Sequence, residues 1–528
     1  MKKLFTLITL FAGTVAAMGT DYTDKLVVNI NNTATVPVTT TISVEEQPDG
    51  KYSLQLKNFM LTAGKNPEDV MPVGTINISD VDGTSAGNTT MLSTSQSIKI
   101  ENGDTPGIDF WMGSMLPEVP VNVKAEMAAE RLYALITINM PGIGDIEVVF
   151  GDVYQMANSG FELFHTATSG DVTSDEPDNW HSFMSCTGAF ASLVSTVPHT
   201  FISQEARPGS AGTSSVLIKS GKVLGIVVAN GTMTNGRLQA GAMSATDPKN
   251  CAFIDITSED TDTNGDLFHN KFYGKPDSMS VWVKFTQETP QTDYPYATVT
   301  AVITDGSYYQ EPVDKDYTDI IVARAANATI ESKDGVWQKL TIPFDYEPYT
   351  DKDAKTILMT FSTNAGAGKG TGNDELYVDD LEMIYNCSAT GITIKGTPVD
   401  GFGTAADNVY EVIVDGDNAD VDIADIAVTT NGKGARVTME KADVDCIGGG
   451  SDVIITVTSA DLKKNNTYCV KTRSAQYAGI NNAAIGAGGK EEVKAIYNVN
   501  GQQIKSPAKG SICIVKYTNG KTVKKIVK

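Results

Sequence analysis

Aromatic side chains between residues 157 and 386 are the first candidates for chemistry, because an exposed ring can stack on the face of a sugar. Trp180 follows the polar stretch 175–179, which favours exposure, whereas Trp282 and Trp337 lie in alternating apolar runs typical of core strands. Four tyrosines border loops: Tyr294, Tyr296, Tyr308 and Tyr309. The pattern predicts sugar stacking by Trp180 and these tyrosines, and the alternative for each is an ordinary place in the core.

An acidic loop is the second candidate, because its spacing imitates the first half of an EF-hand. Asp260, Asp262, Asn264, Gly265 and Asp266 occupy the early positions. Lys271 stands where the bidentate Glu should be, and neither flank has a helical pattern. The loop is therefore expected to be solvated, with an irregular calcium loop as the alternative.

The histidines and cysteines show no spacing that indicates a catalytic or zinc site. The six Cys residues have no CxxC motif, and the four His residues are scattered through the central part of the chain: His165, His181, His199 and His269. The Gly83–Gly87 segment matches G-x-S-x-G, but no helical pattern follows it, as a nucleophile elbow would require. Nothing in these patterns requires an enzyme.

Composition limits the class of protein that could carry these residues. The chain has 528 residues and a net charge of −23, which argues against nucleic acid and anionic membrane surfaces as partners. Thr, Val and Ile runs alternate with Asn-Gly and Asp-Gly turns, so the expected class is all-β. A chain of this length should divide into three or four domains.

Residues 18–151 contain seven or eight short strand patterns and no helical one, which suits a small antiparallel barrel. The opening strand, the run from Asp49 to Phe59 and the closing short strands resemble the calycin-like domain of exported Bacteroidetes proteins. The resemblance implies a barrel that can hold a small apolar ligand, although an eight-stranded barrel can equally be filled by its own side chains, which is the interpretation we favour.

Residues 157–386 open with Ser159-Gly160-Phe161-Glu162 and close with Val378-Asp379-Asp380-Leu381. The motif order between them resembles the putative carbohydrate metabolism domain of Bacteroidetes surface proteins. It is also similar to jelly-roll carbohydrate-binding modules. The resemblance implies a β-sandwich that binds a polysaccharide without cleaving it. The alternatives are a glycoside hydrolase or related carbohydrate-active enzyme, and a structural or adhesive surface protein.

Carboxylates at the two ends of this sandwich predict a structural Ca²⁺ ion. The first and last strands of a jelly roll commonly lie side by side, which would bring Glu162 close to Asp379 and Asp380. Carboxylates that close repel one another unless a cation intervenes. Strand alternation lets one Asp face the ion, and Asp379 is favoured. The alternative is that all three cap loops in solvent.

Residues 387–478 read as an immunoglobulin-like β-sandwich, and residues 479–494 as a Gly-rich flexible linker. Residues 495–528 contain two strand patterns, an Asn519–Gly520 turn signal and a basic end. This tail resembles the C-terminal sorting domain of the type IX secretion system of Bacteroidetes, which implies that secretion machinery as a partner. The alternative is an ordinary closing hairpin.

Residues 1–17 carry Lys2 and Lys3, an apolar run and the small residues Val15-Ala16-Ala17, the pattern of a cleaved signal peptide. No other run is long enough to cross a bilayer as a helix. We therefore expect a protein that is exported through the periplasm to the cell surface or the extracellular space.

Overall fold

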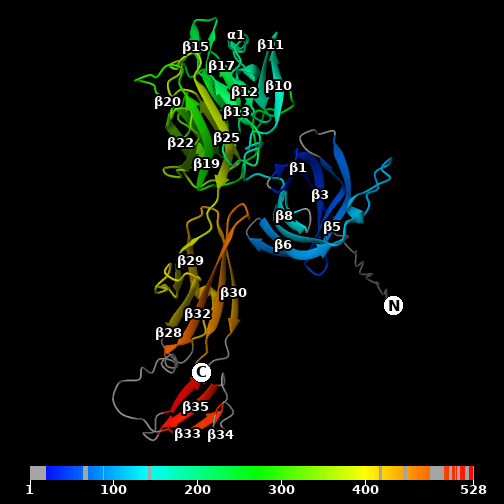
Figure 1. The fold of residues 1–528 in the computed structure, drawn as a ribbon, viewed down its shortest axis with the longest axis vertical. Helices are drawn as coiled ribbons and strands as arrows, with labels where there is room; N and C mark the ends of the chain where they lie inside the picture. The colour runs from blue at the N-terminus through cyan, green and yellow to red at the C-terminus, as the bar shows by residue number, and fades with distance from the viewer. Residues whose placement is uncertain are drawn as a thin grey trace, which may run out of the picture. The chain divides into compact units, whose positions relative to one another are not determined.

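Strands make up most of the regular secondary structure in the computed structural model of the chain (Figure 1). It describes residues 19–31, 33–62, 69–86, 89–140, 144–414, 419–443, 449–475, 493–498, 502–505, 507, 512–517 and 522–526. The predicted signal peptide and residues 479–492 of the predicted linker lie outside the described residues. The helical elements with given bounds among the described residues are short: η1 (Gly113–Met115), η2 (Phe183–Ser185), α1 (Ala191–Val194), η3 (Thr318–Ile320) and η4 (Ile423–Asp425). Among the described residues no helix has the length and apolar character needed to cross a bilayer.

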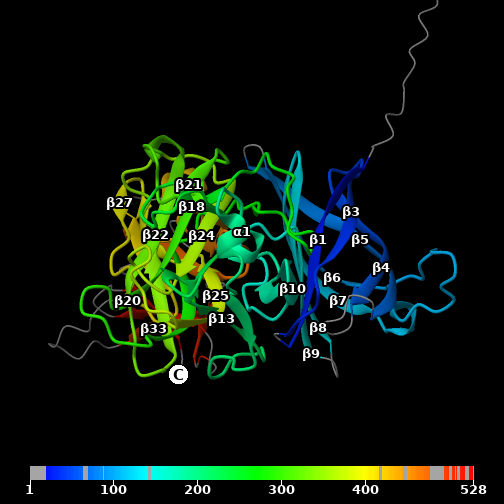
Figure 2. The ribbon, with the colours of Figure 1, turned by 90° about the horizontal axis from the view of Figure 1, so that it is seen from above.

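The N-terminal region is a closed antiparallel barrel, drawn in blue and cyan in Figure 2. Its strands follow chain order: β1 (Thr20–Ile30), β3 (Val38–Glu46), β4 (Tyr52–Thr62), β5 (Val70–Ala86), β6 (Thr89–Ile98), β7 (Val119–Ala128), β8 (Arg131–Met140) and β9 (Gly144–Phe150). A two-residue strand, β2 (Thr33–Ala34), extends one edge. Closure comes from β1, which pairs with β3 and also with β9. The predicted barrel is confirmed.

The central region is a two-sheet sandwich. The five-stranded sheet has the order β12 (Thr200–Ser203), β13 (Ser215–Lys219), β25 (Glu375–Ile384), β19 (Ser278–Thr286) and β23 (Gln338–Pro343). The four-stranded sheet has the order β16 (Thr232–Thr234), β24 (Thr356–Ser362), β20 (Tyr296–Thr304) and β22 (Ile321–Glu331). Alternate residues of both sheets, such as Val281 and Met359, bury into one apolar cluster, as face-to-face packing requires.

Smaller sheets accompany the sandwich and carry several of the polar residues discussed below. The first is the hairpin of β10 (Phe164–Ser169) and β11 (Val172–Pro177). The second has the order β17 (Arg237–Ala240), β18 (Asn250–Ile254) and β21 (Tyr309–Glu311), and the third pairs β14 (Gly221–Val223) with β15 (Val227–Ala229).

Barrel and sandwich belong to one compact unit, residues 1–385 with residues 460–463. Tyr154, between the two, packs its ring edge against Tyr133 of β8 at 4.8 Å and against Tyr385 at 5.7 Å. Its hydroxyl donates to Glu126 Oε2 at 2.6 Å. The boundary expected between residues 151 and 157 therefore falls inside a shared core, and we expect a fragment cut there to expose buried rings.

The second unit holds the remaining sheets. One sheet has the order β27 (Thr397–Pro398), β26 (Ala389–Ile394) and β29 (Ile426–Thr430), and another has the order β28 (Val409–Val414), β32 (Asn465–Ser474), β31 (Ser451–Thr458) and β30 (Arg436–Asp443). Tyr410, Tyr468 and Ile392 bury between them. The tail forms its own sheet, in the order β34 (Gln503–Ile504), β33 (Val493–Asn498), β35 (Ile512–Tyr517) and β36 (Thr522–Ile526).

Candidate functional site

Trp180 is not an exposed stacking residue, so the prediction for it is wrong. Its side chain is fully buried between Phe161, at 5.4 Å between ring centroids, and Phe361, at 6.0 Å. The indole Nε1 donates to the carbonyl of Ala157 at 3.1 Å. The polar stretch before it misleads because residues 175–177 belong to β11 and residues 178–179 form the turn that follows, while the indole points into the core.

The four tyrosines do not form one site. Tyr309 is fully buried, so its stacking role is also wrong. Tyr294 and Tyr308 are 38% and 39% exposed, while Tyr296 is half-buried at the start of β20. Tyr294 and Tyr308 lie beyond opposite ends of this strand, and nine strand residues span roughly 30 Å. One sugar chain of modest length would not contact both.

The structure instead gathers aromatic and charged side chains on the outer face of the five-stranded sheet. On β19, Val281 and Val283 point into the core, so Trp282 and Lys284 point outward. Trp337, just before β23, and Tyr377 of β25 lie beside Lys284, whose Nζ is 5.6 and 3.9 Å from their ring centroids. Trp282 and Trp337 are half-buried. Their expected place in the core is therefore wrong.

We call this region the outer sheet face and define it by the following side chains: Glu205, Arg207, Trp282, Lys284, Trp337, Lys339, Tyr377, Asp380 and Glu382. Part of it is hollowed, with a volume of about 330 Å³. The hollow is lined by Arg207, Trp282, Lys339, Asp380 and Glu382, together with Ser159, Gly160, Ala211, Ser280 and Leu381. It is a shallow, mainly polar site with one large ring in its wall.

Charges on the outer sheet face are held in fixed places by one another. The Arg207 guanidinium lies 5.2 Å from the Trp282 ring centroid and donates through Nε to Asp380 Oδ2 at 2.6 Å. Lys284 Nζ donates to both oxygens of Glu205 at 2.7 Å, and these bonds are the main reason that the pKa of Glu205 lies below its ordinary value. Such pairs keep donors and acceptors oriented towards solvent.

The three carboxylates predicted to bind calcium do lie near one another. Leu381 N donates to Ser159 O at 2.9 Å, which joins the two ends of the sandwich. Glu162 Oε1 accepts from the amides of Thr213 and Ser214, both at 2.8 Å. Asp379, fully buried, accepts from the amides of Arg207 at 2.7 Å and Asp380 at 2.8 Å. We call Glu162, Asp379 and Asp380 the donor-saturated cluster.

Asp379 and Asp380 do not face opposite ways, because the register of β19 and β25 shifts here. Trp282 pairs with Asp379 and Ser280 with Glu382, so β25 carries one extra residue. Asp380 has φ +41°, and both carboxylates contact Arg207. The alternation argument that favoured Asp379 therefore fails. The calcium ion stays a prediction, and amide and guanidinium donors already occupy several of the oxygens that would bind it.

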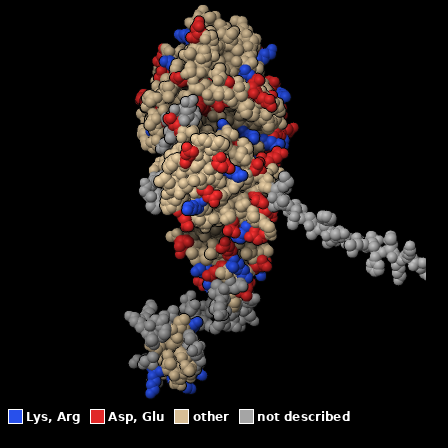
Figure 3. Space-filling view, turned by 90° about the vertical axis from the view of Figure 1, so that its right-hand side faces the viewer, with Lys and Arg blue, Asp and Glu red and all other residues tan. Residues whose placement is uncertain are grey.

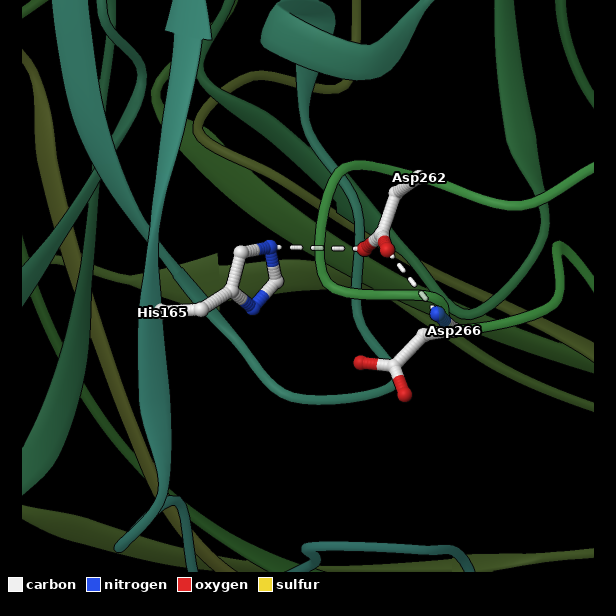
Figure 4. Close-up of side chains that lie close together, drawn as sticks. All are labelled: His165, Asp262 and Asp266. Atoms are coloured by element: carbon white, nitrogen blue, oxygen red, sulfur yellow. Dashed lines mark hydrogen bonds and ion pairs between the residues drawn. The ribbon is translucent and has the colours of Figure 1, made fainter.

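A second polar cluster was not predicted. Asp262 of the acidic loop is not solvated: its side chain is 1% exposed and faces His165 and His181. Figure 4 shows His165, on β10, pointing at Asp262, with Asp266 beside it on the loop. Asp260 pairs with Arg237 at 2.9 Å and Asp266 accepts from Asn179 N at 2.9 Å, so the loop does not close like an EF-hand. Sequence spacing gave no signal, because the members are distant along the chain.

The barrel interior is occupied by apolar side chains, including Leu26, Val44, Leu54 and Phe150. A hollow of about 870 Å³ lies across β1, β6, β7, β8 and β9, and most of the side chains that line it are polar, for example Asn29, Gln96 and Asn122. These contacts favour a barrel filled by its own side chains. A small apolar ligand stays a prediction.

Charge is mixed on the surface. On the face drawn in Figure 3, acidic side chains are scattered among basic ones across the described residues.

Comparison with known proteins identifies one region. Residues 18–152 match the family model of the calycin-like β-barrel domain, which is the closed barrel described above. No curated protein sequence matches the chain. The crystal structure of the infectious bursal disease virus VP2 subviral particle aligns with 70% of this chain and 77% of that chain, at 10% identity and a TM-score of 0.11. A TM-score this low carries no argument about fold or function.

Proposed function

We propose that this chain is an exported carbohydrate-binding protein without catalytic activity, and that the outer sheet face of its central sandwich binds the glycan. The observation that carries the proposal is the hollow of about 330 Å³ in which the Trp282 ring stands beside Arg207, Lys339 and Asp380. A sugar offers C–H groups to an aromatic face and hydroxyls that both donate and accept. The hollow supplies a ring, cationic donors and carboxylate acceptors within one patch.

The geometry of the outer sheet face suits weak binding to part of a long polysaccharide. The hollow is shallow, and Trp337, Tyr377 and Lys284 continue the outer sheet face along neighbouring strands of the same sheet. A site of this kind buries little area, which suits a Kd in the micromolar to millimolar range, roughly −8 to −4 kcal/mol. A polysaccharide that spans several such contacts is the substrate class we propose.

A glycoside hydrolase is the second candidate, because burial raises the pKa of Asp379 to about 7, the value wanted in a general acid. Its carboxylate is fully buried, however, and accepts two backbone N–H groups. A group held in this way does not reach a glycosidic oxygen. Binding without cleavage is the reading that this geometry supports better, and a purely adhesive surface protein is the third class.

Export is part of the proposal. The support is the apolar, lysine-headed sequence of residues 1–17 and the basic tail, which forms a sheet of its own. We propose that the tail directs the chain through type IX secretion machinery to the cell surface or the medium.

The proposal is tested by a glycan array with the full chain, followed by titration of the best ligand against Trp282→Ala. Loss of the ring should weaken binding about tenfold, since one stacking contact contributes on the order of 1.4 kcal/mol. Phe110→Ala is the matched control, because Phe110 is an aromatic residue 60% exposed in the connection between β6 and β7 of the barrel and is not part of the outer sheet face. Equal binding by both variants removes the proposed site, and reducing sugar released from the bound glycan favours the hydrolase.

A further inference from the structure

Four buried side chains on three separate segments converge on one point of the central sandwich. His165 and Glu176 are cross-strand partners on the β10–β11 hairpin. His181 lies just after this hairpin and bridges Thr234, and Asp262 lies on the acidic loop. All four side chains are 10% exposed or less. We call His165, Glu176, His181 and Asp262 the unpartnered cluster.

Each member has one polar atom anchored and the other aimed at the common point. Glu176 Oε1 accepts from Ser182 N at 2.7 Å and from Ser182 Oγ at 2.5 Å, so the atom of Glu176 that points to the common point is Oε2. Asp262 Oδ1 accepts from the amides of Asn264 and Asp266, so the atom of Asp262 that points to the common point is Oδ2. Neither remaining oxygen has a hydrogen-bond partner among the described residues. Two carboxylate oxygens thus face inward with no donor.

The imidazoles are oriented in the same way. His165 Nδ1 lies 3.1 Å from Asp178 Oδ1, and His181 Nε2 lies 3.3 Å from the carbonyl of Leu267. When each of these nitrogens carries the proton, His165 Nε2 and His181 Nδ1 present lone pairs to the common point. Those two nitrogens also have no hydrogen-bond partner within the part of the chain that the structure describes. A carboxylate or carbonyl behind each ring is the usual outer support of a metal-binding histidine.

Three distances between the inward atoms are close to those around one small cation, and Glu176, His181 and Asp262 offer ligand atoms within 4.8 Å of one another. His165 Nε2 lies 3.3 Å from Asp262 Oδ2 and 3.8 Å from Glu176 Oε2, and His181 Nδ1 lies 3.4 Å from Asp262 Oδ2. Zinc holds nitrogen and oxygen ligands at about 2.0–2.1 Å, so neighbouring ligands of a tetrahedral ion lie roughly 3.3 Å apart. Calcium and magnesium prefer all-oxygen shells with more ligands, whereas imidazole suits zinc.

We propose that the unpartnered cluster is a structural zinc site with His165 Nε2, His181 Nδ1, Glu176 Oε2 and Asp262 Oδ2 as its four ligands. Two carboxylates and two neutral imidazoles carry a charge of −2, which one Zn²⁺ neutralises. The ion joins the β10–β11 hairpin, the segment after it and the acidic loop. Because all four positions are filled by protein, the site is closed and has no place for a substrate. The proposal is independent of glycan binding.

The test uses the full chain without a histidine tag, freed of metal by a chelator and then dialysed against zinc or calcium. We expect one zinc per chain by elemental analysis, and we expect cobalt in place of zinc to give the intense visible spectrum of tetrahedral coordination. Zinc should also raise the melting temperature by about 5 °C or more relative to the chelated chain, since a ligand that binds only the folded state stabilises it.

Asp262→Asn and His165→Gln should each lose the bound zinc and the zinc-dependent melting shift. His269→Gln is the control, because His269 contacts Ser258 O near the same loop and lies outside the cluster. A wild-type chain that takes up no zinc and melts alike with zinc and with chelator overturns the proposal and leaves a protonated hydrogen-bonded network. Binding of calcium but not zinc overturns it as well. Should a variant fail to fold, the wild-type stoichiometry and cobalt spectrum still decide.

Discussion

The central sandwich contains two groups of buried or half-buried carboxylates that solve the same electrostatic problem differently. In the donor-saturated cluster, the oxygens of Glu162 and Asp379 accept backbone amides, and Asp380 pairs with Arg207. In the unpartnered cluster, one oxygen each of Glu176 and Asp262 faces imidazole nitrogens and accepts no hydrogen bond from the described residues. A count of acidic residues, three in the first group against two in the second, would rank the first group higher.

The difference lies in what the backbone supplies. The segment from Arg207 to Ser214 lays its amides against Glu162 and Asp379, so protein donors do the work that a cation could do. Ser182, which follows the β10–β11 hairpin, donates to the outer oxygen of Glu176, and amides of the acidic loop donate to the outer oxygen of Asp262. Cation sites are therefore better recognised by unsatisfied inward atoms than by acidic sequence.

The largest loss of stability should come from removing Asp379, the buried acceptor of the donor-saturated cluster. Asp379→Ala leaves the amides of Arg207 and Asp380 without their acceptor, which should cost about 3–4 kcal/mol of unfolding free energy. Chemical denaturation of the full chain measures this change in unfolding free energy. Asp379→Asn keeps an acceptor oxygen and should cost less.

The same denaturation series distinguishes protein donors from calcium. If amides satisfy Asp379, the loss caused by Asp379→Ala is equal with excess calcium and with chelator. A loss that shrinks sharply in chelator would show that calcium, as first predicted from the sequence, holds this end of the sandwich.

His199 provides an internal reference for a buried imidazole that no carboxylate faces. Burial lowers its pKa to about 4, against the small opposing effect of the bond between Nδ1 and Lys219 O at 2.7 Å. The folded pKa is below the unfolded value of 6.5, so stability is complete above pH 6.5 and is lost as pH falls towards 4. The loss should be on the order of 3 kcal/mol.

His199→Asn keeps a donor for the carbonyl, because its amide nitrogen takes the place of Nδ1, but it cannot titrate. Its unfolding free energy, measured by denaturation from pH 7 to pH 4, should fall less steeply than that of the wild type. Parallel curves for His199→Asn and the wild type would mean that His199 does not govern this pH range.

Strand periodicity predicted most of the barrel. Alternating runs anticipated β1, β3, β4, β8 and β9 and parts of β5 and β6, because one face of each strand is buried and the other is not. β7 was not anticipated: Pro117 and Pro120 flank its start and weaken the strand pattern. The match of residues 18–152 to the calycin-like model confirms the family of this region.

The sites were harder to predict because they depend on contacts between distant segments. Nothing near Trp180 in sequence reveals that Phe161 and Phe361 enclose it. The bulge that turns Asp379 and Asp380 to one side is equally hidden, since it appears only in the register with β19. His165 and Glu176 come together only when the β10–β11 hairpin forms, and Asp262 reaches them only when the acidic loop is folded. Hydrophobic periodicity and short motifs describe one strand or loop at a time, whereas each of these sites is formed by several strands and loops.

The smallest loss of stability should follow removal of the charge of Asp380, at the rim of the donor-saturated cluster. Asp380→Asn weakens a half-buried pair with Arg207, whose side chain is 22% exposed against 29% for Asp380, and should cost about 1 kcal/mol or less. The exposed pair of Lys395 and Asp425, 3.6 Å apart, is the control, and Asp425→Asn should be near neutral. Asp380 also lines the hollow beside Trp282, so Asp380→Asn should weaken glycan binding measured by titration although the chain remains folded. Unchanged binding with reduced stability would assign Asp380 to the architecture of the sheet alone and would leave Trp282, Lys339 and Glu382 as the side chains that recognise the glycan.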